Sequence, residues 1–348
     1  MFPDIAYLDF AARWFGKVRY DLATSGLKPV TAAELGGAAV DDFGARERFI
    51  AAIALRYGVP AEEVVPCLGA SGALFVAYAT LLERGSALLA EEPAYEPLWR
   101  VAEALGIRVE RFRRGLGRLE PELVLDAVTE GVELVVLSNP HNPSSALTDD
   151  RSLMALASAL EQRGIRLLVD EAYLEGVAPK RCARALAPNI LTCSSVTKCL
   201  GVPWARAGFL ILPEADARRA DRVELHTAGR APPASWAFGE LALSQAERLL
   251  ERARCIQTQK REIVDAFMAR HADSLVWDAP PAGSLFGWLQ DRRGRRSLEL
   301  VEKGIESRGV IVSPGIFFGD PCAFRMSWTA DSPALERGLE LLEEVLEL

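Results

Sequence analysis

The sequence has few of the residues that mark disulfide-bonded or metal-binding proteins. It contains six cysteines and three histidines in 348 residues, and no two cysteines form a C-x-x-C pair. This usage argues against a disulfide framework and against a zinc site of ordinary spacing. We therefore predict reduced thiols, a cytoplasmic location and no bound metal.

Long apolar runs and an excess of basic residues are also missing. The segment from Met1 to Tyr7 has no basic region, so we expect no secretory signal. No stretch reaches the roughly 18 uninterrupted apolar residues that a membrane helix needs. The net charge of −8 comes from interspersed acids and bases. We expect neither a membrane span nor a nucleic-acid partner.

Short apolar runs alternate with helical patterns between Val64 and Val169. Runs such as 134–138 and 165–169 are apolar almost throughout, which is typical of strands buried on both faces of a parallel sheet. A long helical pattern at 236–270 is predicted to bridge two domains. Residues 1–40 look irregular, and composition alone fits an ordered arm and a plain extension equally well.

Several polar side chains follow directly after predicted strands. Asn142, Asp170, Tyr173 and Lys198 all lie just beyond strand ends. In an open α/β sheet, ligands bind at the carboxyl ends of the strands. The sequence therefore predicts one site that contains these four residues.

Lys198 lies among small and hydroxyl residues rather than charged ones. A lysine in a partly apolar loop has its ammonium form disfavoured, and a neutral amine can form a Schiff base. Ser195 and Arg206 could donate to one anion, as could backbone N–H groups where Gly69-Ala70-Ser71 enters a helix. The alternatives are a surface lysine and a close-packed turn of small residues.

Four motifs follow one another along almost the whole chain. They are Asn139-Pro140-His141-Asn142-Pro143, Asp170-Glu171-Ala172-Tyr173, Ser195-Val196-Thr197-Lys198 with Arg206 eight residues on, and Phe324-Arg325-Met326-Ser327. In this order the chain resembles the fold-type I, class I/II aminotransferases, which use pyridoxal 5'-phosphate (PLP). It is most similar to the compact histidinol-phosphate aminotransferase branch.

The resemblance implies a fold and a division of the chain. The expected fold is a three-layer, mostly parallel α/β sheet in a large domain at 41–250. A smaller α+β domain would combine the N-terminal arm (1–40) with the C-terminal segment (251–348). The resemblance also implies a homodimer.

The resemblance also assigns roles to individual residues. Lys198, Asp170 and Tyr173 would be catalytic, with Lys198 holding PLP as a Schiff base and Asp170 pairing with the ring nitrogen. The remaining cofactor contacts would come from Ala70, Ser71, Tyr95, Asn142, Ser195 and Arg206. Arg325 would bind the substrate α-carboxylate, and Gly26 would lie over the substrate.

Three positions depart from the family pattern. Ser144-Ser145 replaces a Thr-Gly pair, Trp204 replaces a glycine six residues after the lysine, and Phe43 stands near a position where a tyrosine often reaches the neighbouring subunit's phosphate. We expect Trp204 to narrow or reshape the substrate side of the site.

The predicted function is transfer of an amino group between an L-amino acid and a 2-oxo acid. The first alternative is a PLP-dependent lyase, decarboxylase or cyclising enzyme, because the same Lys198 and Asp170 serve these reactions. A regulator is disfavoured because the chain has no room for a DNA-binding domain. A nicotinamide oxidoreductase is disfavoured because no G-x-G-x-x-G follows the first strand.

Overall fold

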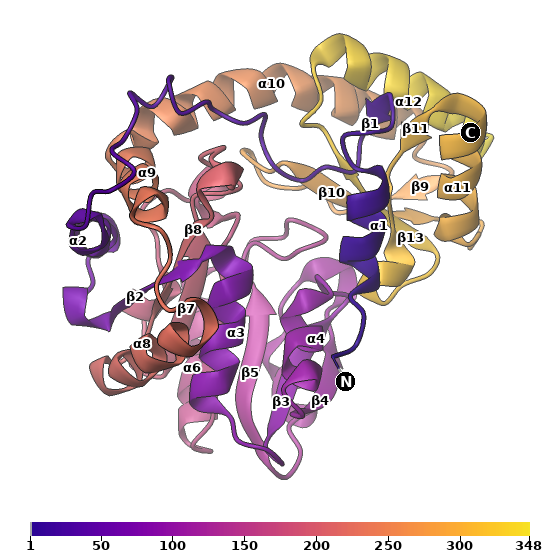
Figure 1. Cartoon of the computed structure of the whole chain (residues 1–348). Helices are drawn as coiled ribbons and strands as arrows, with labels where there is room; N and C mark the ends of the chain where they lie inside the picture. Colours follow the sequence, from indigo (N-terminus) through magenta and orange to yellow (C-terminus); the bar gives the residue numbers. More distant parts are fainter. Residues whose placement is uncertain (1) are drawn as a thin grey trace.

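The larger of the two main sheets has seven strands (Figure 1). The structure is a computed structural model and describes residues 2–348. In spatial order the strands are β2 (Val64–Leu68), β8 (Ala207–Ile211), β7 (Ile190–Ser195), β6 (Arg166–Asp170), β5 (Val132–Ser138), β3 (Ala87–Glu92) and β4 (Arg108–Arg113). Only β8 runs against the others, because it is antiparallel to both β7 and β2. The prediction of a mostly parallel sheet is confirmed.

Helices cover both faces of this sheet and form three layers. One face packs against α3 (Gly69–Leu81), α4 (Pro97–Ala104) and α8 (Glu214–Ala228). The other face packs against α5 (Pro121–Asp126), α6 (Asp150–Glu161), α2 (Ala45–Tyr57) and α9 (Pro233–Ser244). Alternate residues of β5 enter opposite cores, with Leu134 and Val136 on one side and Val135 and Leu137 on the other. This two-sided burial is why the strand is apolar throughout.

The smaller sheet belongs to the C-terminal part of the chain. Its strands are β12 (Ser313–Pro314), β13 (Ala323–Ser327), β10 (Phe286–Asp291) and β9 (Leu275–Val276), and all neighbouring pairs are antiparallel. It shares a core with α11 (Ser297–Arg308), α12 (Ser332–Leu346) and the end of α10 (Ala246–Arg270). In Figure 1, α10 runs from α9 above the large sheet to α12. The domain limits at 40/41 and 250/251 stay a prediction, and α10 continues across the second of them.

Two expectations about local structure were wrong. The N-terminal 40 residues are not merely irregular, because they contain α1 (Ala6–Trp14) and β1 (Tyr20–Asp21). Strand β1 is only two residues long and pairs with β11 (Val310–Ile311), a partner far along the chain. The helical pattern at 236–270 is two helices, because Gln245 leaves the helical conformation and donates from its side chain to the Leu35 carbonyl.

In Figure 1, α1 is drawn in front of the small sheet, and its N-terminal end lies near α4. The Tyr7 backbone N–H donates to the Glu96 carboxylate at 2.7 Å, and Glu96 directly precedes α4. Along residues 2–348, no helix is both long and apolar enough to span a bilayer.

Candidate active site

A cavity of about 470 Å³ lies at the carboxyl ends of β5, β6 and β7. It brings together every site residue predicted from the sequence: Gly26, Ala70, Ser71, Tyr95, Asn142, Asp170, Tyr173, Ser195, Lys198, Arg206 and Arg325. Helix α1 adds side chains that the sequence did not predict. Among residues 2–348, no group of three or more acidic, histidine or cysteine side chains is placed to hold a metal ion.

One end of the cavity is built for an anion. Ala70 and Ser71 lie in the first turn of α3, where backbone N–H groups have no partner within the helix. Gly69 has φ +70, and a Cβ there would lie 2.6 Å from Arg206 Nη2. A Cβ on Gly208 would in turn overlap the Gly69 backbone. These two glycines let the Arg206 guanidinium reach the helix start, and Arg206 forms no ion pair with any described carboxylate.

Lys198 follows β7 and points into the cavity. Burial lowers the pKa of its amine, and the nearby Arg325 and Arg206 guanidiniums lower it further. Its Nζ is 3.4 Å from Ser25 Oγ, and Ser25 Oγ also accepts from the Tyr173 hydroxyl at 2.8 Å. Ser25 therefore joins the lysine and the tyrosine. A lysine with a lowered pKa is closer to the neutral form that acts as nucleophile and base.

Asp170 ends β6 as a buried carboxylic acid. Burial raises its pKa to about 6, and the negative charge of Glu91 adds to the rise, whereas the Ala172 backbone N–H and Lys198 oppose it. The Ala172 N–H donates to Asp170 Oδ1 at 3.0 Å. A cation beside this carboxyl would keep it ionised. The charge of Asp170 therefore favours a positively charged ring nitrogen at this point.

Asn142 is held by a buried network behind the cavity wall. Its backbone N–H donates to Ser138 Oγ at 2.9 Å, and the Ser138 backbone N–H donates to Glu91 at 2.8 Å. Glu91 is fully buried and pairs with Arg114 at 2.6 Å. Arg114 also donates to Thr148 Oγ1, at the far end of the same turn. Sequence reasoning missed this ion pair because its members lie 23 residues apart, with Glu91 in β3 and Arg114 directly after β4.

The turn after Asn142 keeps a left-handed residue without a glycine. Ser145 has φ 63, a conformation that costs a non-glycine residue of the order of 1 kcal/mol. Its hydroxyl donates to the Phe286 carbonyl at 2.8 Å. Ser144 replaces the neighbouring residue of the pair and bonds to His141 Nδ1 at 2.7 Å. Side-chain hydrogen bonds thus hold the turn that the Thr-Gly pair forms in the family pattern.

Arg325 lies in β13, between β10 and β12, and is fully buried. Its guanidinium donates to Asn142 Oδ1 at 2.9 Å and to the Tyr7 hydroxyl at 2.7 Å. It is flanked by the Phe286 ring at 4.8 Å. No described carboxylate lies within ion-pair distance of it, and its Nε has no partner. A buried cation with only neutral partners is costly, so the site favours an incoming carboxylate.

Tyr7 and Ser25 are the main site residues that the sequence did not reveal. Tyr7 contacts Arg325 across 318 residues, and its ring packs edge-on to Tyr95 with centroids 5.5 Å apart. The one available signal was the helical spacing of Tyr7, Ala11 and Phe15, all of which line the cavity. Trp204 does not line it; its indole N–H donates to the Val30 carbonyl at 2.7 Å, outside the cavity.

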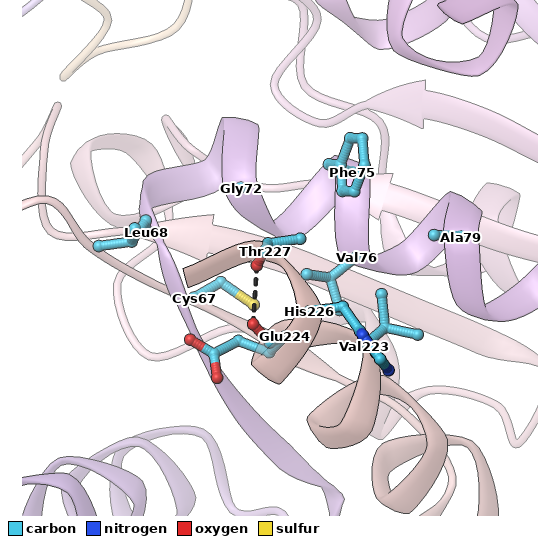
Figure 2. Close-up of a pocket in the computed structure, with 10 residues that line it drawn as sticks. All are labelled: Cys67, Leu68, Gly72, Phe75, Val76, Ala79, Val223, Glu224, His226 and Thr227. Atoms are coloured by element: carbon cyan, nitrogen blue, oxygen red, sulfur yellow. Dashed lines mark hydrogen bonds between the residues drawn. The ribbon is translucent and has the colours of Figure 1, made fainter. Parts of the chain in front are cut away.

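A second cavity, of about 540 Å³, lies between α3 and α8 on the outer side of the large sheet (Figure 2). It is lined mainly by apolar groups: Cys67, Leu68, Gly72, Phe75, Val76, Ala79 and Val223, together with Glu224, His226 and Thr227. Thr227 donates to the Glu224 carbonyl at 2.8 Å. None of the predicted site residues lines this cavity, although Gly72 directly follows Ser71.

The chain belongs to the class I and II aminotransferase family. The profile described as "Aminotransferase class I and II" matches residues 39–342, so the family resemblance seen in the motifs is confirmed. The capreomycidine synthase of Streptomyces vinaceus is 25% identical over 86% of this chain and 79% of that protein. The aspartate aminotransferase of Thermococcus kodakarensis is 27% identical over 83% of this chain and 76% of that protein.

The fold is also that of solved aminotransferases. The crystal structure of a PLP-dependent aminotransferase from Streptococcus suis matches with a TM-score of 0.91 over 99% of this chain and 98% of that chain. The two sequences are 20% identical. The match confirms the predicted three-layer fold with a mostly parallel sheet.

Proposed function

We propose that the protein is a PLP-dependent aminotransferase that moves an amino group between an L-amino acid and a 2-oxo acid. The observation that carries this proposal is the joint placement of Lys198, Asp170 and Arg325 in one cavity. The same cavity contains Ala70, Ser71 and Arg206, which we call the anion cradle. The residues fit the cofactor, because Arg206 and the start of α3 offer donors to a phosphate and the Asp170 carboxyl suits a cationic ring nitrogen.

In the proposed reaction, the cofactor and Lys198 have different roles. Bound PLP supplies an aldehyde that captures amines and a ring that takes up the electrons left on a substrate carbon. Lys198 holds the cofactor covalently and, once released, moves a proton to and from the substrate α-carbon as general base and acid. Its lowered pKa favours the neutral amine that the base role requires.

In the proposed site the cofactor is held by six further residues: Asp170, Tyr173, Asn142, Ser71, Ser195 and Tyr95. The Asp170 carboxylate would accept from the ring N–H. The Asn142 amide would donate to the ring oxygen, as would the Tyr173 hydroxyl once its proton turns away from Ser25. Because Asn142 Oδ1 already accepts from Arg325, its Nδ2 is the free donor. The remaining three residues are proposed to bind the phosphate, through the hydroxyls of Ser71 and Ser195, and to stack on the ring, through Tyr95.

Arg325 binds the substrate α-carboxylate with its two-pronged guanidinium. Gly26 lies next to Lys198, since a Cβ at Gly26 would be 3.8 Å from Lys198 Cδ. The bare backbone of Gly26 therefore leaves room for substrate above the lysine.

A cyclising or bond-cleaving PLP reaction is the second candidate. It is favoured by two likenesses: the similarity over 86% of the chain to capreomycidine synthase, which is not named as an aminotransferase, and the TM-score of 0.87 with the PLP-dependent cyclase OrfR. The same Lys198 and Asp170 would serve either reaction, because both reactions need the cofactor to be held by a lysine and its ring to be paired with a carboxylate.

Absorbance spectroscopy separates the two candidates. The purified protein is mixed with PLP and then with single amino acids, with Lys198→Ala as control. Transamination converts the yellow enzyme to the aminated form of the cofactor, and a 2-oxo acid restores the colour. Loss of amino acid without aminated cofactor would favour the second candidate. A protein that never turns yellow would refute both.

The proposed enzyme is a homodimer in which a second copy covers the cavity of Figure 2. That cavity is apolar and adjoins the anion cradle. The same chain displays Val40 and Phe43, which are 72% and 84% exposed, in the segment before α2. Two copies related by a twofold axis could bury both features reciprocally.

Sedimentation of Phe43→Asp tests this assembly. The charge should weaken the dimer, whereas Leu123→Asp, at an exposed apolar position on α5, should leave it intact. A monomeric wild-type protein, or equal effects of both substitutions, would overturn the proposal. All six cysteines are free thiols, which supports the proposed cytoplasmic location.

A further inference from the structure

Part of the active-site cavity is lined by apolar side chains that the proposed chemistry does not use. Leu8, Ala11 and Phe15 come from α1, and Leu27 and Pro29 come from the segment that follows. We call these five residues the apolar wall. Leu8 is 38% exposed although it faces the cavity, so an apolar group placed there would remove apolar surface from water.

Helix α1 places this wall next to the carboxylate anchor. Tyr7 accepts a hydrogen bond from Arg325 at 2.7 Å, and its ring packs edge-on to Phe15 with centroids 6.1 Å apart. Its backbone N–H is tied to Glu96, which fixes the helix to the large sheet. A substrate held by its carboxylate at Arg325 and by its amine near Lys198 would direct its side chain along α1.

The charged groups of the cavity already have partners in the proposed reaction. They are Asp170, Lys198, Arg206 and Arg325. These serve the ring nitrogen, the amine, the phosphate and the α-carboxylate in turn. The other groups left to meet the substrate side chain carry no charge. They are the apolar wall, the apolar residues Ala172 and Pro203, and the hydroxyls of Tyr7, Thr24, Ser25 and Thr197.

We propose that the substrate is an amino acid with an uncharged, predominantly apolar side chain, and that Leu8, Ala11 and Phe15 determine this preference. The inference rests on the proposed function, because it assumes that Arg325 binds the α-carboxylate. Each methylene buried against the wall should strengthen binding roughly fourfold.

Carboxylates that cannot react test the wall separately from catalysis. The PLP-loaded enzyme is titrated with propionate, butanoate, pentanoate and hexanoate at constant ionic strength, and the change in the cofactor spectrum gives each Kd. Affinity should rise roughly fourfold per methylene until the wall is filled. Succinate and glutarate should bind more weakly than pentanoate, because their second carboxylate would be desolvated without a partner.

A matched pair of variants locates the effect. Ala11→Arg should weaken pentanoate at least tenfold and strengthen glutarate, because it places a cation in the wall. Ala12→Arg, one residue along α1 and exposed to solvent, should change neither Kd. Ala11→Val is a milder change that takes up space in the cavity. In this variant the affinity should stop rising at a shorter carboxylate than in the wild-type enzyme.

The outcomes separate this inference from the proposed function. The proposed role of the apolar wall would be refuted by any of three results: affinity that is independent of chain length, a wild-type preference for glutarate over pentanoate, or equal effects of Ala11→Arg and Ala12→Arg. If the chain-length trend appears but no amino acid aminates the cofactor, the proposed function is wrong, whereas the proposed role of the apolar wall in binding is supported. If acidic amino acids are the best amino-group donors, the proposed aminotransferase function is supported and the proposed preference for apolar side chains is wrong.

Discussion

Asn142 Oδ1 accepts a hydrogen bond of 2.9 Å from Arg325 Nη1, which links the turn after β5 to strand β13 across 183 residues. The side chain that is proposed to hold the cofactor oxygen thus also contacts the proposed carboxylate anchor. The contact joins the small sheet to the large one at the site. All four hydrogen-bond acceptors of Arg325 (Asn142, Tyr7, Ala23 and Ser313) are neutral, so its charge remains available.

Replacing Arg325 with lysine should separate substrate binding from cofactor binding. Arg325→Lys keeps the charge but loses the planar fork, so one charge-assisted hydrogen bond to the carboxylate is lost. Such a bond is worth about 1.5–3 kcal/mol, so we expect pentanoate to bind roughly 10- to 150-fold more weakly. Spectral titration of the PLP-loaded enzyme measures this.

The affinity for PLP itself should stay within a few-fold of wild type, because Arg325 is not part of the anion cradle. Arg118→Lys, at an exposed position, is the control. Equal loss of PLP and pentanoate affinity would assign Arg325 a structural role instead.

The buried pair of Glu91 and Arg114 should be costly to break. In Glu91→Gln the Arg114 guanidinium keeps its charge but loses its counter-ion, and such losses cost about 3–5 kcal/mol. Urea unfolding of the PLP-loaded protein would report the change. The double variant Glu91→Leu/Arg114→Met should recover most of it, since no charge is then left buried.

Glu91→Gln should also loosen Asn142, because Glu91 holds Ser138 and Ser138 holds the Asn142 backbone. A loss below about 1 kcal/mol in the single variant would show that water or another group compensates Arg114.

Much of the site could be predicted from the sequence because it lies at strand ends. Strands buried on both faces are apolar throughout, so their ends can be recognised. Asp170 is the last residue of β6, and Asn142 and Lys198 come shortly after the ends of β5 and β7. In an open sheet these ends share one rim. The pattern of an apolar strand with a polar residue at its end was therefore enough to predict that these three residues share one site.

The rest depends on contacts between distant segments. Tyr7 meets Arg325 across 318 residues, and Ser25 meets Tyr173 across 148. The helical spacing of Tyr7, Ala11 and Phe15 does not show which distant residue they meet, and α1 is only nine residues long, so it offers few turns to recognise. The reversed direction of β8 was equally hidden, because an apolar run such as 207–211 does not show its direction.

Asp170 should make the cofactor-free protein depend on pH in a defined window. Its folded pKa is about 6 and its ordinary value is 3.8, so between these values the folded state binds more protons than the unfolded state. Stability from this group is therefore present below about pH 4 and is lost as the pH rises to about 6. The loss is about 3 kcal/mol, by 1.36 kcal/mol per pKa unit.

Asp170→Asn removes this titration. Urea unfolding of the cofactor-free proteins measures the free energy of unfolding. Relative to wild type, this free energy should increase in the variant between pH 4 and pH 6, and the difference should be constant above pH 6. A constant difference across the whole range would mean that the Asp170 pKa is not raised. Asp273→Asn, on a helix-end turn at the surface, is the control.

Trp204 should act on substrate through the segment that carries Leu27 and Pro29. Its indole N–H donates to the Val30 carbonyl at 2.7 Å, its ring packs edge-on to Phe238, and the Val30 N–H donates to the Gly201 carbonyl. Trp204→Gly removes the first two contacts and frees the segment. Pentanoate should then bind several-fold more weakly, while the affinity for PLP stays unchanged because the anion cradle is intact.

Trp204→Phe separates packing from hydrogen bonding, since a phenyl ring can keep the contact with Phe238 but cannot donate to Val30. If the hydrogen bond positions the segment, the phenylalanine variant should show most of the effect of the glycine variant; if ring packing does so, it should resemble wild type. The same titrations with the carboxylate series, together with the ranking of amino-acid donors, provide the measurement. An unchanged ranking and unchanged Kd values in Trp204→Gly would show that this residue does not shape the substrate side of the site.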